Sequence, residues 1–208
     1  MRILVIADEE SRYYWDFYEE GKLDGIDLIL SAGDLSAHYL SFLATFAHCP
    51  VLFIRGNHDD NYEKVYPEGC ECIEDKIYVY QGIRILGLGG SMRYRPGNNQ
   101  YTEREMRRRV RKLWFQLFRR KGFDILLTHA PAFELNDGRD LPHQGFRVFR
   151  DLLDKYHPKF FVHGHVHMSY GRQHKRYDKY NQTHVINAYE RCIFEFEETD
   201  VEHHLDMV

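Results

Sequence analysis

The segment Gly56-Asn57-His58-Asp59 directly follows the short apolar run Val51–Ile54 and decides how the rest of the chain is interpreted. About a hundred residues later, Gly164-His165-Val166-His167 follows a second apolar run, Phe160–His163. The two segments place an amide, a carboxylate and three imidazoles in turns that contain glycine. Oxygen and nitrogen donors without thiolates suit hard or borderline divalent cations. The pattern therefore predicts a metal site built from loops that follow strands.

Further candidate ligands also stand where predicted strands end. Asp8 comes after the first apolar run, Asp34 after the second, and His129 after the run at Ile125–Thr128. In α/β proteins, ligands bind in the crevice outside the carboxyl ends of the strands. Five strand ends carrying such side chains predict one shared site. Taken singly, Asp8 could instead be a helix cap and each histidine a buried, hydrogen-bonded side chain.

The order of predicted elements indicates a mixed α/β sandwich. The first half alternates strands and helices, which favours parallel strands covered by helices, and the later strand pairs favour antiparallel pairing. Helices are predicted at Arg12–Lys22, Ala37–His48, Thr102–Lys121 and Phe146–His157. The predicted strands are Arg2–Ala7, Leu28–Ser31, Val51–Ile54, Ile77–Tyr80, Ile83–Leu88, Ile125–Thr128, Phe160–His163, His184–Asn187 and Ile193–Phe196.

Composition sets broad limits on the class of protein. The chain has 208 residues, 43% of them hydrophobic, which suits one domain over residues 1–208 with a basic helical insertion at about 91–122 and a tail at about 198–208. A net charge of −4 argues against a general nucleic-acid or membrane-surface protein. The first apolar run is too short for a signal peptide or a membrane span, so we expect a cytoplasmic protein.

Together these segments resemble the calcineurin-like metallophosphoesterase superfamily. Its motifs are Asp-x-His, Gly-Asp, Gly-Asn-His-Asp/Glu, a lone His and Gly-His-x-His, and the resemblance covers residues 2 to about 196. It implies an α/β fold, a four-layer α/β/β/α sandwich of two mixed β-sheets flanked by helices. It also implies two metal ions bridged by Asp34, with Asp8 and His167 on the first ion and Asn57, His129 and His165 on the second.

The resemblance implies a catalytic reaction as well. The expected function is metal-dependent hydrolysis of a phosphodiester, with a phosphomonoester as the alternative, by attack of a metal-bound hydroxide at phosphorus. Asp34 and His58 are the catalytic candidates, His58 facing the substrate phosphate and the leaving group. The expected partner is a small phosphate ester, with nucleotides among the candidates, and no membrane. The sequence does not indicate an oligomeric state.

The first motif departs from the family, because Asp8-Glu9-Glu10 stands where Asp-x-His is expected. Glu10 is therefore a candidate metal ligand, with a solvated surface glutamate as the equal alternative. A carboxylate ligand shifts preference toward Mn²⁺, Mg²⁺ or Fe²⁺ over zinc. We expect two divalent ions, Mn²⁺ first, with Fe²⁺, Zn²⁺ or Mg²⁺ as alternatives.

Substrate contacts are predicted for Asn57, for Arg93 in a glycine-rich loop and for His143 in a loop before the last predicted helix. Arg95 shares the Arg93 loop and is a second candidate. For the His143 loop, an ordinary Pro-initiated turn is the alternative. Over Thr102–Lys121, nine basic and two acidic residues give +7, which leaves −11 for the rest of the chain.

The helix predicted at Thr102–Lys121, called the basic helix below, has two interpretations. Its charged face is either solvated or a surface that docks an anion. A nuclease or RNA-processing phosphodiesterase using this helix is one alternative function. A non-enzymatic scaffold on a degenerate fold, as in a subunit of the retromer coat, is another, because the first-motif histidine is missing.

Overall fold

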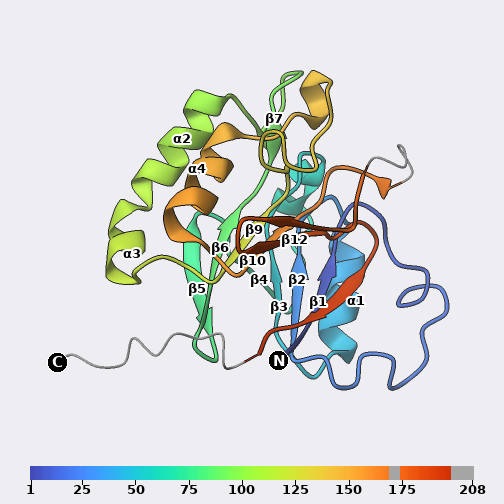
Figure 1. Ribbon diagram of the computed structural model, residues 1–208. Coiled ribbons are helices and arrows are strands. Elements are labelled where there is room, and N and C mark those ends of the chain that lie inside the picture. Colours follow the sequence, from blue (N-terminus) through green and yellow to red (C-terminus); the bar gives the residue numbers. More distant parts are fainter. Residues whose placement is uncertain (169–173, 198–208) are drawn as a thin grey trace.

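The first of two mixed sheets carries the N-terminus. A computed structural model describes residues 1–168 and 174–197, and the predicted tail at about 198–208 lies outside them (Figure 1). The strand order is β13 (Cys192–Glu195), β1 (Arg2–Ile6), β2 (Leu28–Ser31), β3 (Val51–Phe53) and β4 (Cys70–Cys72). β1 to β4 run parallel, and β13 pairs antiparallel with β1. The first half of the chain therefore has the parallel arrangement that its alternating pattern predicts.

The second sheet has four parallel central strands and antiparallel edges. Its order is β11 (Tyr177–Tyr180), β12 (Thr183–Asn187), β10 (Phe160–His163), β9 (Ile125–Thr128), β6 (Ile83–Leu88) and β5 (Lys76–Tyr80). A two-stranded ribbon, β7 (Ser91–Met92) and β8 (Gln100–Tyr101), stands beside it.

The two sheets pack face to face with helices outside, which confirms the four-layer sandwich. Ile3 and Val5 of β1 point into the core between the sheets, and Leu4 and Ile6 point to the outer face. Both faces of β1 are therefore covered, which is why it is continuously apolar. α1 (Ala37–Phe46) covers the first sheet; α2 (Glu103–Lys112), α3 (Trp114–Arg119) and α4 (Arg147–Tyr156) cover the second.

The helix predicted at Arg12–Lys22 is wrong. This segment forms successive turns, in which the amides of Tyr14 and Trp15 both donate to the carbonyl of Ser11. Aromatic residues are weak helix formers, and here their contacts with α1 decide the backbone. The Trp15 ring packs edge-on against Tyr39 and Phe42, with ring centroids 5.4 and 4.9 Å apart.

The long helix predicted at Thr102–Lys121 is two helices that meet at Leu113. The first helix begins with a capping box, in which the Thr102 side chain accepts from the amide of Glu105 and the Glu105 carboxylate accepts from the amide of Thr102. The strands at Cys70–Cys72, Tyr177–Tyr180, Ser91–Met92 and Gln100–Tyr101 were not predicted, because none of them contains a continuous apolar run of the length used to recognise a strand. None of the helices in the two described ranges has the length and apolar character that crossing a bilayer requires.

Candidate metal centre

Two glycines bring the loops after β2 and β3 into backbone contact. A Cβ on Gly33 would lie 2.6 Å from the Cα of Gly56, and a Cβ on Gly56 would lie 2.6 Å from the nitrogen of Asp34. Gly33 and Asp34 also have positive φ, at 94° and 57°. Any side chain at either glycine would separate the loops. This close approach places the Asp34 carboxylate beside the Gly56-Asn57-His58-Asp59 turn.

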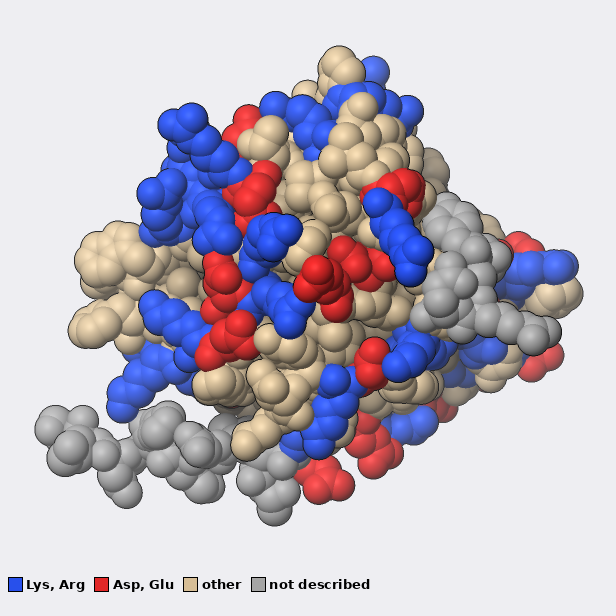
Figure 2. All heavy atoms as spheres, turned by 45° about the horizontal axis from the view of Figure 1, so that its top comes forward, with Lys and Arg blue, Asp and Glu red and all other residues tan. Residues whose placement is uncertain are grey.

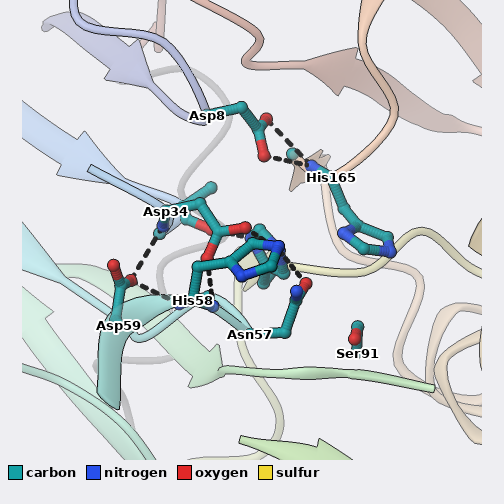
Figure 3. Close-up of polar contacts among 12 residues, drawn as sticks. Asp8, Asp34, Asn57, His58, Asp59, Ser91 and His165 are labelled. Carbon is teal, nitrogen blue, oxygen red and sulfur yellow. Dashed lines mark hydrogen bonds and ion pairs between the residues drawn. The ribbon is translucent and has the colours of Figure 1, made fainter. Parts of the chain in front are cut away.

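A network of backbone donors fixes the Asp34 carboxylate (Figure 3). The amide of His58 donates to Asp34 Oδ1 at 2.7 Å. The amides of Asp34 and Gly56 both donate to Asp59 Oδ2, at 2.8 and 2.6 Å. Burial, and then the charge of Asp34, raise the pKa of Asp59 to about 7. Asp59 thus ties the two loops together, a role that its place in the motif did not reveal.

His129 directs one ring nitrogen at two oxygen atoms. Its Nδ1 lies 2.8 Å from the carbonyl oxygen of Ala32, which accepts only, so Nδ1 carries a proton. Its Nε2 lies 3.0 Å from Asn57 Oδ1 and 3.3 Å from Asp34 Oδ2. A neutral ring would then present a lone pair to two acceptors. With Asn57 Oδ1 facing the ring, a proton or a metal cation among these three atoms would satisfy them, and the donor set fits a cation.

The charges of the group support the same conclusion. Burial alone would lower the pKa of His129, but the Asp34 carboxylate outweighs burial and raises this pKa to about 9. Burial opposes ionisation of Asp34, yet the charge and hydrogen bond of His129 hold the pKa of Asp34 below its usual range. His129 therefore keeps its proton and its positive charge beside Asp34, and a bound divalent ion would supply positive charge at the same place.

His165 completes this group from the loop after β10. Its backbone has a positive φ of 67°, and its amide donates to both carboxylate oxygens of Asp8, at 3.0 and 2.9 Å (Figure 3). Its Nε2 donates to the carbonyl oxygen of Pro142, at 2.7 Å, so the lone pair that could bind a cation is on Nδ1. Burial, and then the charge of His129, lower the pKa of His165 to about 3, so the ring is neutral. Donor atoms of Asp34, His129 and His165 lie within 4.8 Å of one another, a spacing that suits ligands of one cation.

A cavity of about 480 Å³ opens beside this group. It is lined by Asp8, Asp34, His58, Tyr94, Pro142, His143, His165 and His167. Burial raises the pKa of Asp8 to about 7, and the His167 ring lies against Tyr189 with centroids 4.9 Å apart. Loops from both sheets thus meet at one cavity. Tyr94 and the Pro142 carbonyl carried no sequence signal, because neither belongs to a ligand motif.

Comparison with known proteins agrees with this arrangement. The family model described as calcineurin-like phosphoesterase matches residues 1–169. The chain belongs to the calcineurin-like phosphoesterase family. Its members are metal-dependent phosphoesterases, in keeping with the His/Asp group described above. No match was found among curated proteins.

Three solved structures are similar to this family member at low sequence identity, two of them with TM-scores above 0.6. One crystal structure is 14% identical with a TM-score of 0.64, covering 92% of this chain and 93% of that one. The crystal structure of TT1561 of Thermus thermophilus is 16% identical with a TM-score of 0.61, covering 91% and 89%. That of Chaetomium thermophilum Vps29 is 12% identical with a TM-score of 0.43, covering 95% and 83%.

Glu10 lies outside the group of candidate ligands. Its carboxylate accepts from the amide of Ser36, at 3.1 Å, beside the start of α1. The Glu10 carboxylate thus contacts a backbone N–H group at the start of α1. Glu10 is not among the described residues that line the cavity, and its use as a metal ligand stays a prediction.

The residues predicted to contact the substrate differ in where the structure places their side chains. The Arg93 guanidinium bonds the Gln100 carbonyl and pairs with Glu105, and it is Arg95 whose Nη2 reaches His58 Nδ1, at 3.3 Å. His143 lines the cavity, and its ring lies 5.3 Å from that of His165.

The charge pattern of the helix predicted at Thr102–Lys121 assigns Arg109 to its outer, solvated face, and the structure shows this to be wrong. Its side chain is only 11% exposed and pairs with Glu74 and Asp75 at 2.9 Å each. The helical periodicity could not show that these carboxylates lie across from it.

The stability of the metal-free protein should fall by about 2 kcal/mol between pH 7 and pH 9. The folded pKa of His129, about 9, lies above its ordinary 6.5, so its stabilising contribution is complete below pH 6.5 and is lost as pH rises through 9. The pKa values of Asp8 and Asp59 are raised from 3.8 to about 7. Most of the stabilising contribution of these two carboxyl groups is therefore lost between pH 3.8 and pH 7. His165, lowered from 6.5 to about 3, keeps its full contribution above pH 6.5. Urea denaturation in EDTA at several pH values measures this.

Adding Mn²⁺ provides the control for this prediction. A bound cation replaces the proton between Asp34 and His129, and ligands bind metal better once deprotonated. The decline above pH 7 should therefore disappear with Mn²⁺. Constant stability from pH 7 to pH 9 in EDTA would contradict the coupling of His129 to Asp34.

Proposed function

We propose that this protein is a metal-dependent phosphoesterase that hydrolyses a phosphodiester, with Mn²⁺ as the first candidate ion. The observation that carries the proposal is the arrangement at His129, where Nε2 faces two oxygen acceptors inside a buried pocket. A cation or a retained proton would stabilise such a set of converging acceptors. Family membership supports phosphate esters as the substrate class.

The residues that would hold the ions fall into two sets that share Asp34. Asn57 Oδ1, His129 Nε2 and His165 Nδ1 form the inner set, and Asp8 with His167 form the outer set along the cavity wall. Bound divalent ions would lower the pKa of a water molecule and offset the negative charge of the phosphate. The carbonyl oxygens of Ala32 and Pro142 accept from the rings of His129 and His165. These hydrogen bonds orient the two inner ligands.

His58 is placed to act on the substrate rather than on a metal. Its amide is held by Asp34 Oδ1, and the Arg95 guanidinium, which only donates, lies 3.3 Å from its Nδ1. When Nδ1 accepts from Arg95, the ring proton resides on Nε2. That N–H can then donate a hydrogen bond to the leaving oxygen and stabilise the negative charge that develops there.

His143 lines the same cavity as His58 and is a second candidate for a polar contact with the substrate. His143 Nδ1 lies 2.7 Å from Asp140 Oδ2, so Asp140 orients the ring on the cavity wall. Tyr94 adds an aromatic surface to the same cavity. A small phosphodiester with a ring-bearing group, such as a nucleotide, suits this combination of one guanidinium, two imidazoles and a phenol.

Metal removal and restoration test the proposal directly. Protein stripped with EDTA should hydrolyse bis(p-nitrophenyl) phosphate at least about tenfold more slowly than protein to which Mn²⁺ is returned. Fe²⁺, Zn²⁺ and Mg²⁺ serve as parallel additions, and p-nitrophenyl phosphate measures the preference for diesters over monoesters. Metal content is determined on the same samples. Absence of turnover with every ion, together with little bound metal, would favour the scaffold alternative.

A further inference from the structure

The short helix α3 presents three large aromatic side chains to solvent. Trp114 is 66% exposed, Phe115 55% and Phe118 78%. They occupy one outward face of a six-residue helix, and the Trp114 and Phe115 rings touch edge to face with centroids 5.7 Å apart. Adjacent exposed aromatic residues of this size mark interaction surfaces in soluble domains. These three residues are called the aromatic tip below.

The aromatic tip is fixed in its outward orientation by the opposite face of the helix. Leu113 and Leu117 are buried in the core beneath α3. The Gln116 side-chain oxygen accepts from the amide of Ile77 at the edge of the second sheet, at 2.9 Å. The helix therefore cannot rotate to bury its aromatic residues without losing these contacts. The exposure is a property of the fold.

Unpaired positive charges surround the aromatic tip. Residues 111–121 contain Arg111, Lys112, Arg119, Arg120 and Lys121 and no acidic residue. All five are exposed, and within the described part of the chain none forms an ion pair. Figure 2 shows Lys and Arg side chains gathered over α2 and α3, at the left, around an uncharged projecting surface. This cluster is called the basic ring below.

We propose that the aromatic tip and the basic ring dock this protein on the surface of an anionic lipid membrane. Aromatic side chains flanked by Lys and Arg bind at the boundary between headgroups and acyl chains, where hydrocarbon receives the rings and acidic headgroups receive the cations. The net charge of −4 led us to expect no membrane contact. Charges more than about 8 Å away are largely screened at physiological ionic strength, so the basic ring dominates at this surface.

Other occupants fit these observations less well. A second copy of this chain would oppose five cations to five cations. Single-stranded nucleic acid stacks its bases on aromatic faces, but the Trp114 and Phe115 rings are inclined at 72° and offer no common platform. Hydrocarbon has no such orientational requirement. α3 also lies at the end of the second sheet away from the strand ends that carry the candidate metal centre (Figure 1), so docking leaves the cavity open.

Vesicle binding tests the proposal, with Trp114 as its own reporter. The chain has two tryptophans, so Trp15→Phe leaves Trp114 as the single one. Vesicles of phosphatidylcholine with about 30% phosphatidylserine should bind this protein at least tenfold more tightly than phosphatidylcholine alone, because each cation contributes roughly fivefold. Trp114 emission should shift to shorter wavelength only with the anionic vesicles.

Substitutions separate the two parts of the surface. Phe115→Ser with Phe118→Ser should abolish the spectral shift and lower binding at least tenfold, and Arg119→Glu with Lys121→Glu should remove the preference for phosphatidylserine. Phe17→Ser is the matched control, because Phe17 is 59% exposed elsewhere and should leave binding unchanged. Thermal melting checks that each variant is folded. Hydrolysis of a soluble phosphodiester is measured in parallel and should not change, so failure of docking is distinct from failure of the proposed function.

Three results would overturn the proposal. The first is equal binding to vesicles with and without phosphatidylserine, or an unshifted Trp114 emission. The second is binding to a single-stranded RNA oligonucleotide that is tighter than binding to anionic vesicles and depends on Phe118. The third is a dimer in solution that dissociates in the Phe115→Ser, Phe118→Ser variant.

Discussion

Replacing Asp34 with asparagine should lower Mn²⁺-dependent hydrolysis of bis(p-nitrophenyl) phosphate by about a thousandfold. Asp34 belongs to both proposed sets of metal ligands, and the removal of its charge weakens both. A bound ion contributes several kcal/mol to stabilising the transition state, and about 4 kcal/mol corresponds to a thousandfold in rate. The change should reduce kcat together with metal content, because the reacting phosphate and the ions depend on the same carboxylate.

The fold should survive this substitution. Asparagine has the shape of aspartate, and its side-chain oxygen can still accept from the His58 amide as Asp34 Oδ1 does at 2.7 Å. The pKa of His129 should fall, because burial would then act without the opposing carboxylate. Asp24→Asn is the matched control, since Asp24 is an exposed carboxylate that the described structure places outside the cavity. Wild-type turnover with full metal content in Asp34→Asn would refute the shared-ligand assignment.

The sequence could predict which strand ends meet, since that depends on topology. Asp34, Asn57, His129 and His165 each follow a buried strand of a parallel pair, and parallel strands deliver their carboxyl ends to one edge. The structure brings these four together. Their use as metal ligands remains a prediction, and so does that of Asp8 and His167, which reach the same cavity.

Side-chain direction within a loop could not be predicted in the same way. Arg93 and Arg95 share one loop, yet Arg93 turns to Glu105 at the start of α2 while Arg95 reaches His58. Glu10 turns to the amide of Ser36. In each case the choice depends on a partner that is distant in the sequence and lies near only after folding. The helix predicted at Arg12–Lys22 failed for the same reason, because its aromatic side chains contact α1.

Replacing Gly33 with alanine should cost about 3 kcal/mol or more of unfolding free energy. Gly33 has a φ of 94°, and an added Cβ would lie 2.6 Å from Gly56 Cα and 2.8 Å from the carbonyl carbon of Arg55. Both are backbone atoms, which cannot turn aside as a flexible side chain can. Overpacking of this kind costs roughly 1–3 kcal/mol, and strain at positive φ adds to it. Urea denaturation in EDTA measures the loss.

Gly82→Ala separates the backbone strain from the close approach. Gly82 has a nearly equal φ of 86°, but nothing lies within 4 Å of an added Cβ. We expect a loss of only about 1 kcal/mol there, from backbone strain alone. Mn²⁺ should still stabilise Gly82→Ala but not Gly33→Ala, because displacing Gly33 from Gly56 moves Asp34 away from Asn57 and His129. Equal losses in the two variants would show that positive φ, and not contact between the loops, requires glycine at position 33.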